Sequence, residues 1–248
     1  MELMLILVAA FSAGVLNTIA GGGTFLTFPA LVFIGVPPVV ANATSAVAVF
    51  PGYLGGALGF RDELAQFDKA QLVRLVAITF AGGLIGSLLL LISSNEAFSI
   101  VVPFLLLAAT LAFLFGDQIR AWAASKSRAV TPYGTVGLLL VSIYGGYFNG
   151  GLGIVLLALF ALWGMVNIHA MNGLKNGLSF ALSAISVGVF AIGGLIEWHY
   201  ALGMMVASTL GGYAGAPIAR SLPKSAVRLV VAIVGFSMSA VFFWRLLA

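Results

Sequence analysis

A chain of 248 residues that is 62% apolar and only 7% charged does not fit a soluble domain, in which about a quarter of the residues carry charge. Its mean hydropathy of +1.16 and its long apolar runs indicate a polytopic helical membrane protein. The formal net charge of +4 comes from basic residues in short loops, which is typical of membrane orientation and not of a nucleic-acid-binding surface.

Ten apolar helical segments are predicted along the chain from the ends of the apolar runs. They cover residues 2–19, 24–36, 39–60, 70–93, 97–115, 133–149, 152–165, 168–196, 200–219 and 227–245. The first run has no basic stretch before it and no clear cleavage site after it, so we interpret it as a retained helix. The sequence therefore predicts an all-α polytopic membrane protein with a single transmembrane domain over 1–248.

Two of these segments are too short to cross a bilayer, and each follows a glycine-rich break. Segment 24–36 spans roughly 20 Å at 1.5 Å per residue, against about 30 Å of hydrocarbon, and Pro37-Pro38 ends it. Segment 152–165 has the same problem. Irregular backbone at membrane depth is tolerated only where protein or a water-filled cavity satisfies its polar groups. We therefore expect half-length helices packed inside the protein.

The charged loops predict the orientation of the chain in the cell (inner) membrane. The outer loops contain Glu96, Glu197 and His199, and Arg245 is the single basic residue on the outer side. By the positive-inside rule, both termini lie outside. The basic residues of the predicted cytoplasmic loops are Arg61, Lys69, Arg74, Arg120, Lys126, Arg128, Arg220, Lys224 and Arg228.

Each half contains five segments. Because an odd number of passes ends on the opposite side of the membrane, the second half is expected to be inverted relative to the first. We place repeat 1 at about 1–115, a charged cytoplasmic linker at about 116–131 and repeat 2 at about 132–248. Gly21-Gly22 match Gly150-Gly151, and Gly35 matches Gly164, at the same offset of 129. Paired broken segments in two halves of a chain point to a transporter's binding site.

Both short helices begin at a glycine cluster, where unpaired N–H groups and a partial positive charge favour an anion. Glycine also lets a ligand approach the backbone closely. The alternative is tight helix packing, which we prefer for the pairs 52/56, 82/86 and 211/215. The expected substrate-binding residues are Asn17, Gly21, Gly22, Gly23, Thr24, Thr44, Ser45, Asn149, Gly150, Gly151, Gly153, Asn172, Lys175 and Asn176.

Lys175 is the one cation expected inside a membrane span, at a cost of about 2.5–3.5 kcal/mol on insertion scales. It would draw an anion toward the cytoplasmic mouth, or it would snorkel to the interface. Asn172, Asn176, Ser179 and Ser183 form a polar stripe on the same helix. This stripe must face the protein interior, where it lines a path or bonds neighbouring helices.

Enzyme chemistry is not expected. No acidic residue lies in the middle of a span, so a carboxylate proton relay is unexpected, and His169 and His199 lie near loops. The sequence has no Gly-x-Ser-x-Gly nucleophile motif, no Walker motif and no cysteine. We therefore predict a protein that is not an enzyme and that needs no cofactor and no metal.

Four runs in the first half resemble the TauE/SafE sulfite-exporter family: Ser12–Gly23, Pro29–Leu31, Gly35–Pro38 and Ala41–Ser45. In the second half, residues 147–153, 170–172 and 175–176 resemble the repeat of that family, but the Pro-Pro and Thr-Ser elements are missing there. The resemblance implies a secondary transporter of small anions, often sulfur-containing, such as sulfite, sulfonates or related organic acids. We expect export by alternating access of a sulfur-containing or organic anion, such as sulfite, thiosulfate or a sulfonate. A passive anion channel and a non-transport membrane assembly protein are the alternatives. The expected partners are a small anion and the lipid bilayer, with no nucleic acid; a homodimer is left open.

Overall fold

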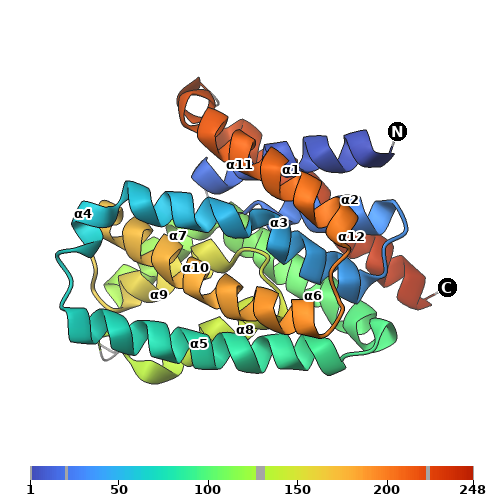
Figure 1. Ribbon diagram of the computed structural model, residues 1–248. Coiled ribbons are helices and arrows are strands. Elements are labelled where there is room, and N and C mark those ends of the chain that lie inside the picture. The colour runs from blue at the N-terminus through green and yellow to red at the C-terminus, as the bar shows by residue number, and fades with distance from the viewer. Residues whose placement is uncertain (1, 20–21, 127–131, 222–223, 248) are drawn as a thin grey trace.

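The computed structural model describes residues 2–19, 22–126, 132–221 and 224–247, and all regular structure in this part of the chain is helical (Figure 1). This confirms the predicted fold class, and each predicted segment corresponds to a helix. These helices are α1 (Glu2–Ile19), α2 (Thr24–Phe33), α3 (Pro38–Gly59), α5 (Lys69–Ile92), α6 (Asn95–Leu114), α8 (Thr135–Tyr147), α9 (Leu152–Leu162), α10 (Ile168–Ile192), α11 (Trp198–Ser221) and α12 (Lys224–Leu247). Gly21 and Arg128 lie outside the described residues.

Two further helices were not predicted. The single turn α4 (Arg61–Leu64) follows α3, and α7 (Gly116–Ser125) occupies most of the segment expected as a charged linker. Helix α7 packs against α9 and buries Ala123, while Trp122 on the same helix is exposed. This amphipathic helix is consistent with a position at the edge of the membrane.

The short helices α2 and α9 end earlier than predicted, and both end in the same way. Gly35 has φ +92° and Gly164 has φ +83°, conformations that favour glycine. The amide of Val36 donates to the Leu31 carbonyl at 3.1 Å, and the amide of Met165 donates to the Phe160 carbonyl at 3.0 Å. Helices of 10 and 11 residues span about 15 and 17 Å, which is half of a hydrocarbon core.

The longer helices suit a bilayer. Within the described chain, α5, α6, α10 and residues 229–246 of α12 are long and apolar enough to cross a membrane. Large apolar side chains such as Ile92, Phe104 and Trp244 are exposed. Hydrocarbon does not penalise such exposure as water does, so the chain is a multi-pass membrane protein.

Helix contacts link the two halves of the chain throughout. Helix α3 packs against α10 and α6 against α12, while α1 packs against α11 and α5 against α8. Helix α3 also contacts α11, and α5 contacts α10. The helices of the two halves correspond in chain order: α1, α2, α3, α5 and α6 in the first half to α8, α9, α10, α11 and α12 in the second. If each helix is replaced by its counterpart in the other half, every contacting pair named above becomes a pair of the same set. The start of α1 and the end of α12 lie at one end of the molecule, and α4 lies at the other (Figure 1).

Glycines bring two of these pairs into close contact. A Cβ at Gly86 of α5 would overlap the carbonyl oxygen of Ile143 in α8, and one at Gly82 would lie 2.5 Å from Cβ of Ser142. A Cβ at Gly211 of α11 would overlap the Phe11 carbonyl oxygen of α1. The packing interpretation is thus confirmed for these three glycines. It is wrong for Gly52, which has open space around it.

Candidate functional site

The first glycine break joins α1 to α2 and is held by a side chain of α1. The backbone N–H of Gly23 donates to Oδ1 of Asn17 at 2.8 Å. Gly23 and Thr24 are buried, and the amide of Phe25 donates to the Gly22 carbonyl at 3.1 Å. The side-chain oxygen of Asn17 thus accepts a bond within the break, while its amide nitrogen, the group expected to donate to a ligand, does not take part in this bond.

The second glycine break joins α8 to α9 and has a different backbone. Gly151 has φ +73° and directly precedes α9, a conformation that a residue with a side chain rarely adopts. The hydroxyl of Tyr144 donates to the Gly150 carbonyl. The hydroxyl of Tyr53 in α3 donates to Oδ1 of the buried Asn149 at 3.4 Å. Gly153, in the first turn of α9, is buried as well.

Both breaks lie against the same face of α6. A Cβ at Gly22 would lie 3.0 Å from the Phe113 ring, and a Cβ at Gly151 would lie 3.2 Å from Cβ of Ala109. Ala109 and Phe113 are one helical turn apart, about 6 Å along the axis. The structure therefore brings together two glycine clusters that are far apart in the sequence, each at the start of a half-length helix.

Helix α3 supplies polar groups that bond neighbouring elements. Ser45 Oγ lies 2.5 Å from Oγ1 of Thr27 in α2, and Thr44 Oγ1 accepts the backbone N–H of Glu197 at 3.0 Å. Thr44 therefore holds the loop before α11, while Ser45 lies beside the helix that starts at the first break. Thr27 and Tyr53 were not predicted as site residues. Thr27 lies one helical turn after Thr24, and Tyr53 lies between Gly52 and Gly56, so their positions in the sequence could have indicated them.

A second cluster of polar side chains lies in the second and third turns of α10. Lys175 is only 7% exposed, and its Nζ donates to Oδ1 of Asn172 at 3.2 Å. Asn176 faces α3, since a Cβ at Gly56 would lie 2.7 Å from its Cγ. Burial of Lys175 argues against the snorkelling interpretation. The ion pairs of the described residues are Arg61–Asp62, Arg120–Asp117 and His199–Glu197, so Lys175 has no carboxylate partner there.

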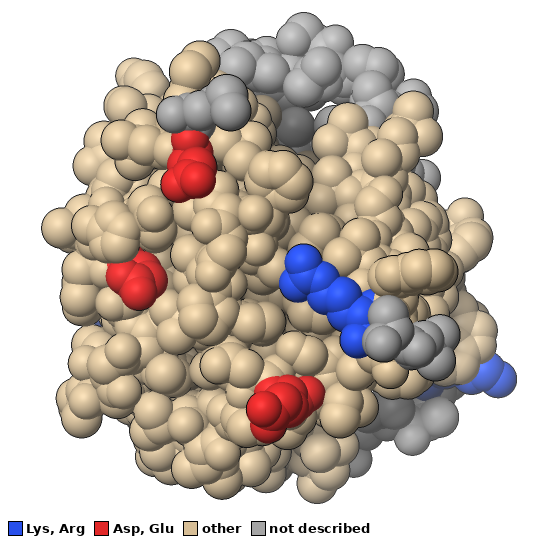
Figure 2. Space-filling model, turned by 90° about the vertical axis from the view of Figure 1, so that its right-hand side faces the viewer, with Lys and Arg blue, Asp and Glu red and all other residues tan. Residues whose placement is uncertain are grey.

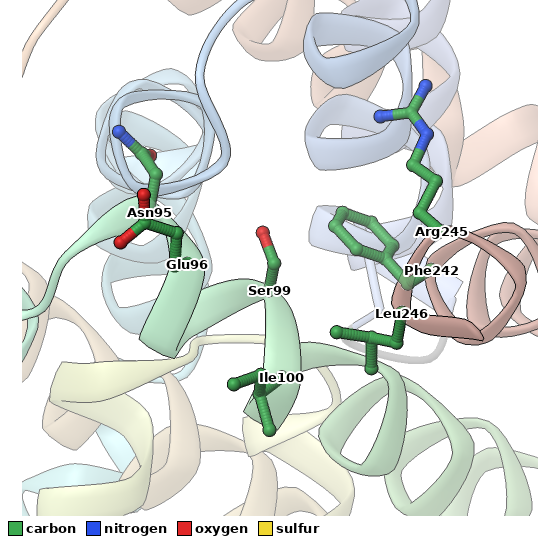
Figure 3. Close-up of a pocket in the computed structure, with 7 residues that line it drawn as sticks. All are labelled: Asn95, Glu96, Ser99, Ile100, Phe242, Arg245 and Leu246. Atoms are coloured by element: carbon green, nitrogen blue, oxygen red, sulfur yellow. The ribbon is translucent and has the colours of Figure 1, made fainter. Parts of the chain in front are cut away.

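A pocket of about 350 Å³ lies between the start of α6 and the end of α12. Glu96 and Arg245 lie on opposite sides of it, with the Ser99 hydroxyl between them (Figure 3). This end of the molecule carries few, well-separated charges (Figure 2). Arg245, the single basic residue on the predicted outer side, thus lines a pocket. The remaining lining residues are Asn95, Ile100, Phe242 and Leu246.

A layer of aromatic rings connects this pocket to the second break. Phe242 is 2% exposed and stacks on Phe28 of α2, with ring centroids 6.2 Å apart. Phe28 also meets Phe98 at 6.3 Å and Phe148 at 5.9 Å, both edge-on. Phe148 directly precedes Asn149, so contacting rings lead from the pocket to the second break.

Spanning helices combined with two half-length helices that start at glycine breaks define a membrane transporter. The chain matches the model of the family described as "Sulfite exporter TauE/SafE" over residues 6–242. The chain belongs to this family, as the resemblance in its glycine motifs predicted, and it is a membrane transporter by family.

Several curated relatives match along nearly the whole chain. The chain is 29% identical over 239 residues to "Probable membrane transporter protein" of Haemophilus influenzae, covering 96% of this chain and 93% of that protein. It is 28% identical over 244 residues to "Probable membrane transporter protein ORF9" of a Sinorhizobium species, and the match covers 96% of this chain and 90% of that protein. It is 27% identical over 233 residues to "Probable membrane transporter protein YfcA" of Escherichia coli K12, and the match covers 93% of this chain and 86% of that protein. No solved structure matches the chain.

Proposed function

We propose that the protein exports small oxyanions, sulfur-containing ones such as sulfite, thiosulfate or sulfonates, by alternating access. The observation that carries the proposal is Lys175, the one charged side chain that is buried among the residues whose side chains are described. A buried charge without a partner costs several kcal/mol, and a passing anion would offset this cost. None of the acidic side chains that the structure describes is buried, which disfavours a cationic solute.

The two glycine breaks form the other part of the proposed site. The N-termini of α2 and α9 supply partial positive charge and N–H groups toward the anion. Their common position on α6 supports one shared site. The proposed binding residues are Asn17, Gly21, Gly22, Gly23, Thr24, Thr44, Ser45, Asn149, Gly150, Gly151, Gly153, Asn172, Lys175 and Asn176.

The exchange symmetry of the helix contacts supports two inverted repeats, about 1–115 and 132–248, that rock against each other. We take the contacting rings between the pocket and the second break as the place of a gate, which favours a gated transporter over a passive channel. We place the termini outside, because α4 and the start of α5 carry basic residues at the opposite end of the molecule (Figure 1). An inside-negative potential then favours anion exit by about 2.3 kcal/mol per charge per 100 mV.

Flux into proteoliposomes tests this proposal. The purified chain is reconstituted, and uptake of radiolabelled sulfite, thiosulfate and ethanesulfonate is measured. Saturable uptake that is accelerated by unlabelled solute inside the vesicles supports alternating access. Unsaturable flux without counterflow would favour the channel. Absence of flux for every solute, together with a stable co-purifying protein, would favour an assembly role.

A further inference from the structure

We propose that three serines of α10, Ser179, Ser183 and Ser186, bind the transported oxyanion on its way between the glycine breaks and Lys175. This inference rests on the proposed function and names side chains that hold the solute. Its basis is the position of the three hydroxyls and their lack of hydrogen-bond partners.

The serines follow one another on one face of α10. Their spacing of four and three residues keeps them in line on a helix, with rises of about 6 and 4.5 Å between them. From Lys175 to Ser186 the helix rises about 17 Å, roughly half of the hydrocarbon thickness. The row therefore connects a buried cation near one end of α10 with the middle of the molecule.

The hydroxyls of these serines are buried without a hydrogen-bond partner. Ser179 and Ser183 are 1% exposed and Ser186 is 2% exposed, yet none of the three Oγ atoms is bonded. Thr79 and Ser142 also have unpaired buried hydroxyls, but only the three serines of α10 form a row on one helix. Other buried hydroxyls bond to their own helix: Ser87 Oγ donates to the Gly83 carbonyl at 2.8 Å, and Thr110 Oγ1 donates to the Leu106 carbonyl at 2.6 Å. Leaving a buried hydroxyl unpaired is unfavourable, so three in a row indicate a missing acceptor.

The serine face points into the protein. Phe180 of α10 stacks on Phe50 of α3 with ring centroids 5.0 Å apart, and Leu182 contacts Gly83 of α5 on the other side of the helix. At about 100° per residue the serines lie between these two contacts. Helix α10 meets α8 and α9 as well, and these two helices flank the second break. The hydroxyls are thus directed toward the centre of the molecule and away from lipid.

The chemistry of this row suits an oxyanion. A serine hydroxyl can donate one hydrogen bond to an anionic oxygen. Several such neutral donors can bind an anion without a positively charged side chain next to it. Successive hydroxyls let the anion move by exchanging one donor for the next. Lys175 supplies the positive charge at the end of the row, where its amine already bonds Asn172.

Alanine substitutions test the hydroxyls directly. Ser179→Ala, Ser183→Ala and Ser186→Ala should each raise the KM for sulfite, or for whichever of thiosulfate and ethanesulfonate the unaltered protein transports, by about tenfold. Thermal unfolding should be unchanged or shift upward, because each change removes an unpaired buried hydroxyl. Ser87→Ala is the matched control, equally buried but bonded within its own helix, and its KM should stay the same.

Cysteine substitutions test whether the row is reached by solute. The chain contains no cysteine, so Ser183→Cys introduces a single thiol. An anionic methanethiosulfonate reagent should modify it during turnover and block flux, and saturating solute should slow the modification. Ser87→Cys should stay unmodified.

Two outcomes separate failure of this inference from failure of the proposed function. Normal KM in the triple alanine variant, or no reaction at Ser183→Cys in a protein that transports, would overturn the role of the serines and leave the transporter in place. Absence of flux in the unaltered protein would instead remove the proposed function, and this inference with it.

Discussion

Lys175 is the residue on which the anion proposal depends most. Replacing it with methionine removes the buried charge while keeping an unbranched apolar side chain of similar length. We expect Lys175→Met to lower flux at least tenfold, because the solute loses its counter-charge. The free energy of unfolding should stay the same or rise by about 1 kcal/mol or more, because an unpaired buried charge disappears.

Flux assays and thermal unfolding in detergent check this expectation together. Lys69→Met is the control, since Lys69 is exposed at the start of α5 and should tolerate the change. Full flux in Lys175→Met would show that the cation has no part in transport.

At this scale the sequence predicted some of the buried polar residues, such as Thr44, Ser45 and Asn149, but not what they bond. Asn149 pairs with Tyr53, 96 residues away, and Thr44 with the amide of Glu197, 153 residues away. Such partners depend on how helices from the two halves pack, and no local pattern contains this information. The bond that the Asn17 oxygen accepts from Gly23 within the first break was not predicted either.

At the scale of elements, apolar runs and proline or glycine punctuation predicted the helices well. The ends of α2 and α9 were missed by a few residues because Gly35 and Gly164 adopt positive φ before the apolar run ends. Helix α7 was missed because its charged, amphipathic sequence was interpreted as a linker. Contact with α9 stabilises it, and that contact is tertiary.

Close packing of α5 on α8 makes a prediction of its own. Gly86→Ala should destabilise the protein by about 1–3 kcal/mol, because the added Cβ would overlap the backbone of α8 at Ile143. Gly188→Ala on α10 is the control, with open space around the glycine, and should be neutral or stabilising by about 0.5–1 kcal/mol. Thermal unfolding of both variants in detergent measures the difference, and equal stability would contradict the close contact.

At the scale of the whole molecule, the inverted repeat remains a proposal with two kinds of support. The helix contacts are preserved when the halves are exchanged, and Gly35 and Gly164, matched in sequence, cap their helices in the same way. The breaks themselves differ: Asn17 caps the first, whereas Gly151 turns the second with a positive φ. Few identical residues survive between the halves, so sequence alone gave only a weak match.

Orientation in the membrane can be tested with the same cysteine-free chain. Glu96→Cys should react with an impermeant thiol reagent added to intact cells, and Lys126→Cys should react only after the membrane is opened. The expectation follows from the basic residues gathered at one end of the molecule. The reverse pattern of labelling would place both termini in the cytoplasm.

We propose that this chain moves small sulfur-containing oxyanions through a site between its two glycine breaks. Counterflow of radiolabelled sulfite, thiosulfate and ethanesulfonate in proteoliposomes tests this proposal, with Gly151→Val as the site variant. Glycine at this position has φ +73°, and a Cβ there would lie 3.2 Å from Cβ of Ala109, so valine would strain the break and push it away from α6. We predict saturable counterflow of at least one of these anions by the unaltered protein and its loss in a folded Gly151→Val variant. Counterflow that persists in that variant, or no counterflow of any anion by the unaltered protein, would contradict the account.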